Sequence, residues 1–146
     1  MIDPSYPIRV AYYSKLNNIQ YNGDSIPFYS NYVPDDAPDT YIVLTAVSIG
    51  YNDDKKGLET TALVTIEAVS IFDRNSNQGA TKSELIGTEI LKKLLPTPGG
   101  DFQIDGFQNV DAKLSNSPLL TDQNDSQKIF RKVISIFHIL NQIQNG

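Results

Sequence analysis

The side chain best suited to transfer protons is that of His138, the only histidine in the chain. It stands within residues 130–140, where alternation of side chains predicts a β-strand. General base catalysis needs a nucleophile or an acid within hydrogen-bonding reach of the imidazole, and the sequence places no convincing partner beside it. We therefore interpret His138 as a structural or surface residue and find no support for a Ser-His-Asp arrangement.

A second group with chemical potential is a run of polar residues that could offer oxygen ligands to a hard cation. It comprises Asn52, Asp53 and Asp54, followed by Lys55 and Lys56. The spacing departs from that of an EF-hand loop, and no downstream glutamate closes the run. We interpret it as the solvated tip of a hairpin, and we predict no metal site there.

Other motifs that carry chemistry are incomplete or missing. Glu84 and Glu89 are five positions apart on a predicted helix, so they do not share a face as paired carboxylates would. Gly99 and Gly100 lack the lysine and hydroxyl residue of a phosphate-binding loop, so we read them as a turn. The chain has no cysteine, which excludes a thiolate nucleophile, disulfides and a cysteine-based zinc site. We predict that the protein is not an enzyme and carries no cofactor.

Length and composition predict one globular domain over residues 1–146, because 40% of the residues are hydrophobic and 20% are charged. The formal net charge of −5 argues against a protein whose main role is to grip nucleic-acid phosphates. No signal peptide and no apolar run of membrane-spanning length is present, so we expect a protein made in the cytoplasm without membrane contact.

Periodicity and turn residues predict the elements that position these side chains. We expect an α+β fold, with a mostly antiparallel sheet, a long central hairpin and two helices packed on one face. The predicted elements are a helix over 7–16, a small hairpin of 19–21 with 26–29 around Asn22-Gly23, long strands over 41–49 and 58–72, a helix over 85–95 after a capping box at 81–84, a strand over 107–120 that breaks near Pro118, and a strand over 128–140.

Two features point to contacts with other chains. The last predicted strand carries apolar residues on both faces, so we expect both of its sides to be covered. Long exposed strand edges invite uncontrolled pairing, so we also expect other subunits to cover them. The 8 tyrosines, a residue type enriched in interfaces, are concentrated in about the first third of the chain, among them Tyr12, Tyr13, Tyr21, Tyr29, Tyr32 and Tyr51.

One stretch carries a family resemblance. Val33-Pro34-Asp35-Asp36-Ala37-Pro38, running into Tyr41-Ile42-Val43-Leu44, resembles the entry to the first long strand of bacteriophage tail-terminator (tail-completion) proteins, where a segment of the style V-P-x-x-A-P-x-P-Y-I-V-L follows a short helix and hairpin. The strand at 62–69, the helix ending at Leu95 and the strand at 130–140 agree with that order. Asp39 stands where a proline is common in the family.

The resemblance implies a structural virion protein, made in the host bacterial cytoplasm and located at the neck-proximal end of the tail. Such a protein caps the tail tube as a ring, expected to be a hexamer, ends tube polymerisation and offers a docking surface to the neck or head-completion protein. DNA would pass through its lumen without specific binding, which an acidic balance favours. The alternatives are another head–tail connector or neck subunit, or a small ligand-binding module.

Contacts in such a ring would be made by exposed loops. The loops we expect to take part are residues 51–57, 73–79 and 96–100. The candidate interface residues are Tyr51, Asp53, Asp54, Lys55, Lys56, Arg74 and Asn75.

Overall fold

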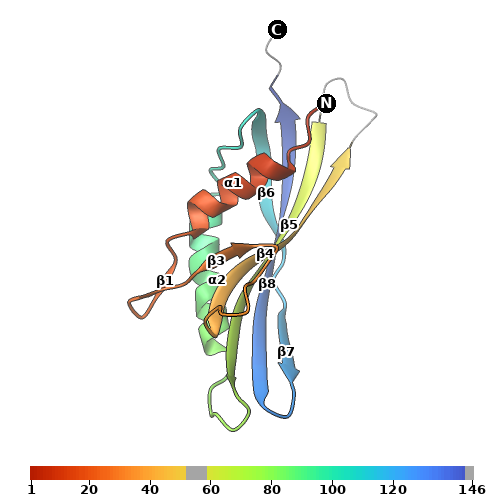
Figure 1. Ribbon diagram of the computed structural model, residues 1–146. Coiled ribbons are helices and arrows are strands. Elements are labelled where there is room, and N and C mark those ends of the chain that lie inside the picture. Colours follow the sequence, from red (N-terminus) through yellow and green to blue (C-terminus); the bar gives the residue numbers. More distant parts are fainter. Residues whose placement is uncertain (52–58, 144–146) are drawn as a thin grey trace.

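The computed structural model describes residues 1–51 and 59–143 and has an α+β fold (Figure 1). The predicted fold class is confirmed. In chain order the elements are α1 (Ser5–Leu16), β1 (Gln20–Tyr21), β2 (Asp24–Ser25), β3 (Phe28–Ser30), β4 (Thr40–Tyr51), β5 (Glu59–Asp73), α2 (Thr81–Leu94), β6 (Phe107–Asn116), β7 (Leu119–Gln123) and β8 (Gln127–Gln142).

The main sheet, as far as the structure describes the chain, has six strands. Five of them follow the order β3-β4-β5-β8-β6, and the sixth, β7, pairs with a different part of β8 from β6. Among the strands that the structure describes, only the β3–β4 pair is parallel, so the sheet is mostly antiparallel as predicted. β4 and β5 form the long central hairpin, in which Thr40 pairs with Ser70 and Tyr51 with Thr60. β6 pairs with one half of β8 and β7 with the other, because the chain breaks at residues 117–118, near the predicted position.

The small hairpin is shorter than predicted. Asn22 and Gly23 adopt positive φ angles of 51° and 83°, as the Asn-Gly signal indicates for a tight turn. The strand after the turn, however, is Asp24–Ser25, and residues 26–27 are not part of it. Phe28–Ser30 leaves the hairpin and joins the edge of the main sheet, parallel to β4. Pro27 lacks an N–H group, which is consistent with its place at this edge.

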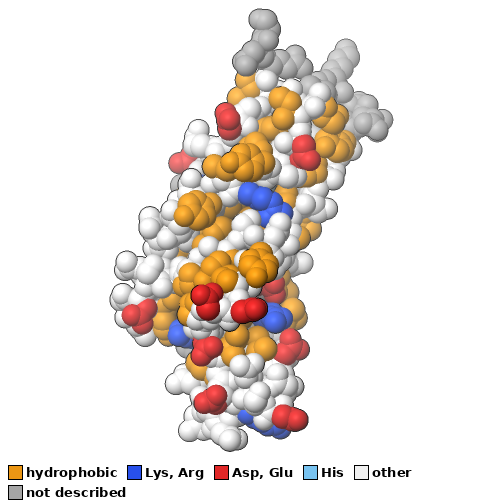
Figure 2. Space-filling view, in the orientation of Figure 1, with side chains coloured by type: hydrophobic (Ala, Val, Ile, Leu, Met, Phe, Trp, Pro, Cys, Tyr) orange, Lys and Arg blue, Asp and Glu red, His pale blue; other side chains and the backbone are white. Residues whose placement is uncertain are grey.

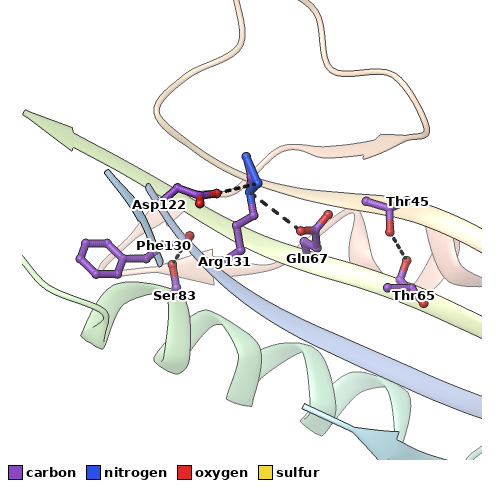
Figure 3. A network of polar contacts seen from close by, with 7 residues as sticks. All are labelled: Thr45, Thr65, Glu67, Ser83, Asp122, Phe130 and Arg131. Atoms are coloured by element: carbon purple, nitrogen blue, oxygen red, sulfur yellow. Dashed lines mark hydrogen bonds and ion pairs between the residues drawn. The ribbon is translucent and has the colours of Figure 1, made fainter. Parts of the chain in front are cut away.

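The predicted capping box at residues 81–84 is wrong. α2 begins at Thr81, so its N-cap is Ala80, and no side chain caps the helix. The amide of Glu84 donates to the carbonyl of Ala80, and its carboxylate does not reach back as a reciprocal cap. Ser83 is instead fully buried, and its hydroxyl contacts Ser70 Oγ at 2.8 Å. It also contacts the carbonyl of Phe130 at 3.1 Å (Figure 3). The hydroxyl of Ser83 therefore links α2 to the strands β5 and β8 and does not cap the helix.

Both helices contribute to a single hydrophobic core on one face of the sheet. Its largest buried side chains include Ile8, Tyr12, Leu16, Ile19, Ile42, Leu44, Ile66, Ile86, Ile90, Leu94, Ile134 and Ile136. Burial of each such side chain contributes roughly 1.5–3 kcal/mol relative to exposure. These alternating positions of β5 and β8 and the apolar stripes of the helices are the features that hold the two layers together.

The opposite face of the sheet is not covered by either helix. Val133, Phe137 and Ile139 of β8 are only partly buried, and Leu63 of β5 is 37% exposed. The prediction that both faces of the last strand become covered, at least toward its C-terminal half, therefore stays a prediction, because within one chain this face is only partly buried. On this face Arg131 Nε lies 3.9 Å from Glu67 Oε1, and Arg131 Nη1 lies 3.6 Å from Asp122 Oδ2 (Figure 3).

Candidate interaction surfaces

The sequence-predicted interface residues do not form one site. Tyr51 ends β4 and is 49% exposed, whereas Arg74 and Asn75 follow β5 at the opposite end of the long hairpin (Figure 1). Asp53, Asp54, Lys55 and Lys56 lie outside the described residues. The interface role of all seven stays a prediction, and it would require two separate contact surfaces at the two ends of the molecule.

At the end that holds Arg74, cationic side chains are engaged within the chain. Arg74 Nη1 donates to the carbonyl of Asn124 at 2.7 Å, and its amide donates to the carbonyl of Ser126 at 3.1 Å. Lys128 Nζ donates to the carbonyls of Ser76 and Gln78. These bonds join the loop after β5 to the turn between β7 and β8, so they position both loops relative to each other.

The most developed polar arrangement is a buried chain of hydrogen bonds that crosses the core. Tyr12 of α1 and His138 of β8 are both fully buried, and the Tyr12 hydroxyl lies 2.5 Å from His138 Nε2. His138 Nδ1 lies 2.9 Å from Asn109 Oδ1 in β6. Asn109 Nδ2 donates in turn to the carbonyl of Gly99 at 3.2 Å. The chain thus ties α1, β8, β6 and the loop after α2 together.

The partners of His138 fix its tautomer. The Asn109 oxygen only accepts, so Nδ1 carries the ring proton and Nε2 accepts the proton of the Tyr12 hydroxyl. Burial lowers the pKa of His138 to about 4, and the carboxylate of Asp111 opposes this in part. Burial likewise raises the pKa of Tyr12. Both groups are therefore neutral at physiological pH, with their hydrogen-bonding capacity used inside the protein.

This arrangement is structural. His138 and Tyr12 have no exposed surface, so a substrate cannot reach either group. The interpretation of His138 as a structural residue is confirmed, and its two partners, which the sequence did not reveal, come from elements far away in the chain.

Removing the Tyr12 hydroxyl tests this arrangement directly. We expect Tyr12→Phe to lower the free energy of unfolding by about 1–3 kcal/mol, because His138 Nε2 would then be buried without a donor. Urea denaturation followed by circular dichroism measures this loss. Tyr13→Phe is the matched control, because Tyr13 lies on the same helix and is 54% exposed. Equal stability of the two variants would contradict the proposed bond.

The described part of the chain can also be compared with the requirements of a metal site and of a membrane span. Among residues 1–51 and 59–143 no group of three or more His, Asp or Glu side chains is placed to hold a metal ion. Neither of the two helices in these ranges has the length and apolarity needed to cross a membrane. Figure 2 shows acidic side chains scattered over the visible face, with apolar patches between them.

An open groove lies beside β6. Residues 95–99, which follow α2, form one wall, and residues 111–114 of β6 form the other. Its volume is about 510 Å³, and its apolar lining includes Leu95, Pro96, Pro98 and Leu114. Leu114 is 41% exposed. A shallow groove that runs along a strand suits an extended segment of polypeptide better than a small molecule, which binds in an enclosing cavity.

Comparison with known proteins gives a match in structure but not in sequence. The sequence matches no protein-family model, and no curated protein resembles it in sequence. The fold matches that of a chain in a solved structure described as the virion of the native gene transfer agent (GTA) particle. The match has a TM-score of 0.60 at 11% sequence identity and covers 94% of this chain and 92% of the other. The chain therefore has a similar fold, over nearly its full length, to a component of that virion.

Proposed function

We propose that this chain is a structural, non-enzymatic subunit of a phage-like virion that caps the tail tube as a ring. The observation that carries the proposal is the fold shared with a chain of the gene transfer agent virion over 94% of the present chain. The structural match extends over nearly the whole of both chains, so it concerns the fold as a unit and not a shared fragment. A structural virion component acts through its surfaces. This fits a chain whose one histidine is buried and hydrogen-bonded to Tyr12 inside the core.

The more specific role follows from the resemblance of residues 33–44 to tail-terminator proteins. In this role the subunit forms a hexameric ring on the last ring of tail-tube protein, ends polymerisation and presents its other side to the neck or head-completion protein. The net charge of −5 suits a lumen through which DNA slides, because acidic groups repel phosphates. No bond is made or broken in this function, so binding energy alone accomplishes it.

Electron microscopy and mass photometry of the protein, alone and mixed with a tail-tube protein from the same genome, test this role. We expect rings with the mass of six subunits, and tubes that carry a ring at one end and stop growing. Tubes that grow equally well with and without the protein would contradict the terminator role. Binding to a connector of the head with no effect on tubes would assign the chain to the neck, the alternative that the same fold match supports.

A further inference from the structure

Within residues 1–51 and 59–143, one edge of the sheet is long, uncharged and not covered by another strand. β3 pairs only with Ile42 to Leu44 of β4, so no described strand covers residues 45–51 on that side. These residues read Thr-Ala-Val-Ser-Ile-Gly-Tyr, without a charge or a proline. Soluble proteins usually blunt such edges with lysine, proline or a covering element, because an open edge is a template for strand pairing.

The backbone of this edge is directed outward. At the end that β3 covers, the amide of Ile42 donates to the carbonyl of Pro27, and the carbonyl of Leu44 accepts from the amide of Asn31. The backbone N–H and C=O groups of Ile42 and Leu44 therefore point away from β5. A bulge between Leu44 and Ala46 shifts the alternation by one residue. Beyond it, the N–H and C=O groups of Val47, Ile49 and Tyr51 are those that point away from β5.

The other side of the sheet ends in β6, which has a free edge of its own. β6 pairs with β8 on one side only within the described residues. Four consecutive residues, 111–114, line the groove described above, so that groove follows the backbone of the strand. An added strand here would find unpaired backbone groups and apolar walls for alternate side chains.

The directions of the strands allow these two edges to meet between copies. In this half of the sheet, Ser48 pairs with Leu63, Leu63 with Phe137 and Phe137 with Lys113, through the strands β4, β5, β8 and β6. All three pairings are antiparallel, so β4 and β6 run in opposite directions. Rotation about an axis along the strands preserves direction, so β4 of one copy would lie antiparallel to β6 of the next.

We propose that the occupant of each edge is a second copy of this chain: residues 45–51 of one subunit add as an antiparallel strand to β6 of its neighbour. Tyr51 shares a strand face with Val47 and Ile49, which pack toward the core side, where the groove also lies. With Ser48 opposite Lys113 of the neighbour, Val47 would lie beside Leu114 and Ile49 beside Ala112, both at the groove. The contact is head-to-tail, which is the kind that closes into a ring. The inference rests on the proposed ring function and names the surface through which subunits join.

Lysines placed on the β4 edge test the pairing. Ala46 and Ser48 are exposed, so Ala46→Lys/Ser48→Lys adds edge charges without removing core contacts. We expect an unchanged melting temperature and ring formation weakened by about tenfold or more in mass photometry. Thr121→Lys/Gln123→Lys in β7 is the matched control, because it places the same charges at exposed alternate positions of a strand that the proposal does not use. The control should form rings like the unmodified protein.

The outcomes separate the two proposals. If the unmodified protein forms rings and the Ala46→Lys/Ser48→Lys variant does so equally well, the edge pairing is overturned and the ring function stands. If the unmodified protein never forms rings, alone or on tubes, the proposed function fails and the edge pairing fails with it.

Cysteine cross-linking gives an independent readout, because the chain has no cysteine of its own. In one subunit, Ser48 and Lys113 stand on opposite edges, three strand spacings or about 14 Å apart, too far for a disulfide. We expect Ser48→Cys/Lys113→Cys, or Ser48→Cys/Asp111→Cys if the register is shifted, to give a reducible ladder of covalent oligomers on oxidation. Ser48→Cys alone should stay uncross-linked. Dimers from this single variant, or no ladder from either pair, would overturn head-to-tail pairing.

Discussion

Acidification should destabilise the fold through its single histidine, by about 3 kcal/mol between pH 6.5 and pH 4. His138 is fully buried and its pKa is lowered from 6.5 to about 4, chiefly by burial. A group with a lowered folded-state pKa binds fewer protons in the folded than in the unfolded protein over this window. Its stabilising contribution is therefore complete above pH 6.5 and is lost as the pH falls toward 4. Urea denaturation at a series of pH values measures the loss.

A variant without a titrating group isolates this effect from that of the carboxylates. His138→Asn should be less stable at neutral pH, but its stability should change little from about pH 7.5 to about pH 5, where most carboxylates stay ionised. The imidazole can also be followed directly, because only one histidine is present. Its NMR signals should not titrate in folded protein over that range. Parallel stability curves for the two proteins, or an imidazole that titrates near pH 6.5, would refute the buried neutral state.

Features fixed by neighbouring residues were predictable from the sequence. Alternating side chains identified β5 and β8, and the Asn22-Gly23 pair identified the tight turn of the small hairpin. Pro118 marked the break between β6 and β7, because proline cannot donate within a sheet. Such signals act over a few residues, so the periodicity of the chain was enough to recognise them.

Features fixed by contacts between distant residues were not predictable in this way. Tyr12 and His138 are 126 positions apart, and nothing near either one marks the other as a partner. The pattern at residues 81–84 indicated a capping box, but α2 already includes Thr81, and Ser83 within that pattern is bonded to Ser70 and Phe130 of the sheet. The parallel pairing of β3 was missed for the same reason, since the hairpin signal beside it describes only local pairing.

The candidate surfaces show a related limit. Loops chosen for their polarity lie at opposite ends of the molecule, because the two ends of a hairpin as long as β4–β5 are far apart. Arg74 was predicted as an interface residue, but its guanidinium is bonded to the carbonyl of Asn124 within the chain. The unpaired edge of β4 depends on where β3 stops pairing, which only the sheet topology shows. The sequence indicated that edges need covering, and the fold identifies which edges those are.

The turn after α2 should respond very differently to alanine at its two glycines. Gly99 and Gly100 both have positive φ angles, 84° and 71°, which cost roughly 1–2 kcal/mol for a residue with a Cβ atom. A Cβ at Gly99 would meet only Asp111 Oδ1 at 3.7 Å, an ordinary contact. A Cβ at Gly100 would lie 2.8 Å from the Phe102 ring and 3.2 Å from the carbonyl oxygen of Leu94.

Phe102 cannot easily move away from such a Cβ. Its ring is buried, with its centroid 5.2 Å from that of Tyr12 and 4.7 Å from that of His138. Overpacking of this kind adds about 1–3 kcal/mol to the backbone cost. We therefore expect Gly100→Ala to lower the free energy of unfolding by about 3 kcal/mol and Gly99→Ala by about 1 kcal/mol, as measured by urea denaturation. Phe102→Leu should recover part of the loss in Gly100→Ala, because the smaller side chain makes room; equal losses at the two glycines would show that Phe102 does not confine this turn.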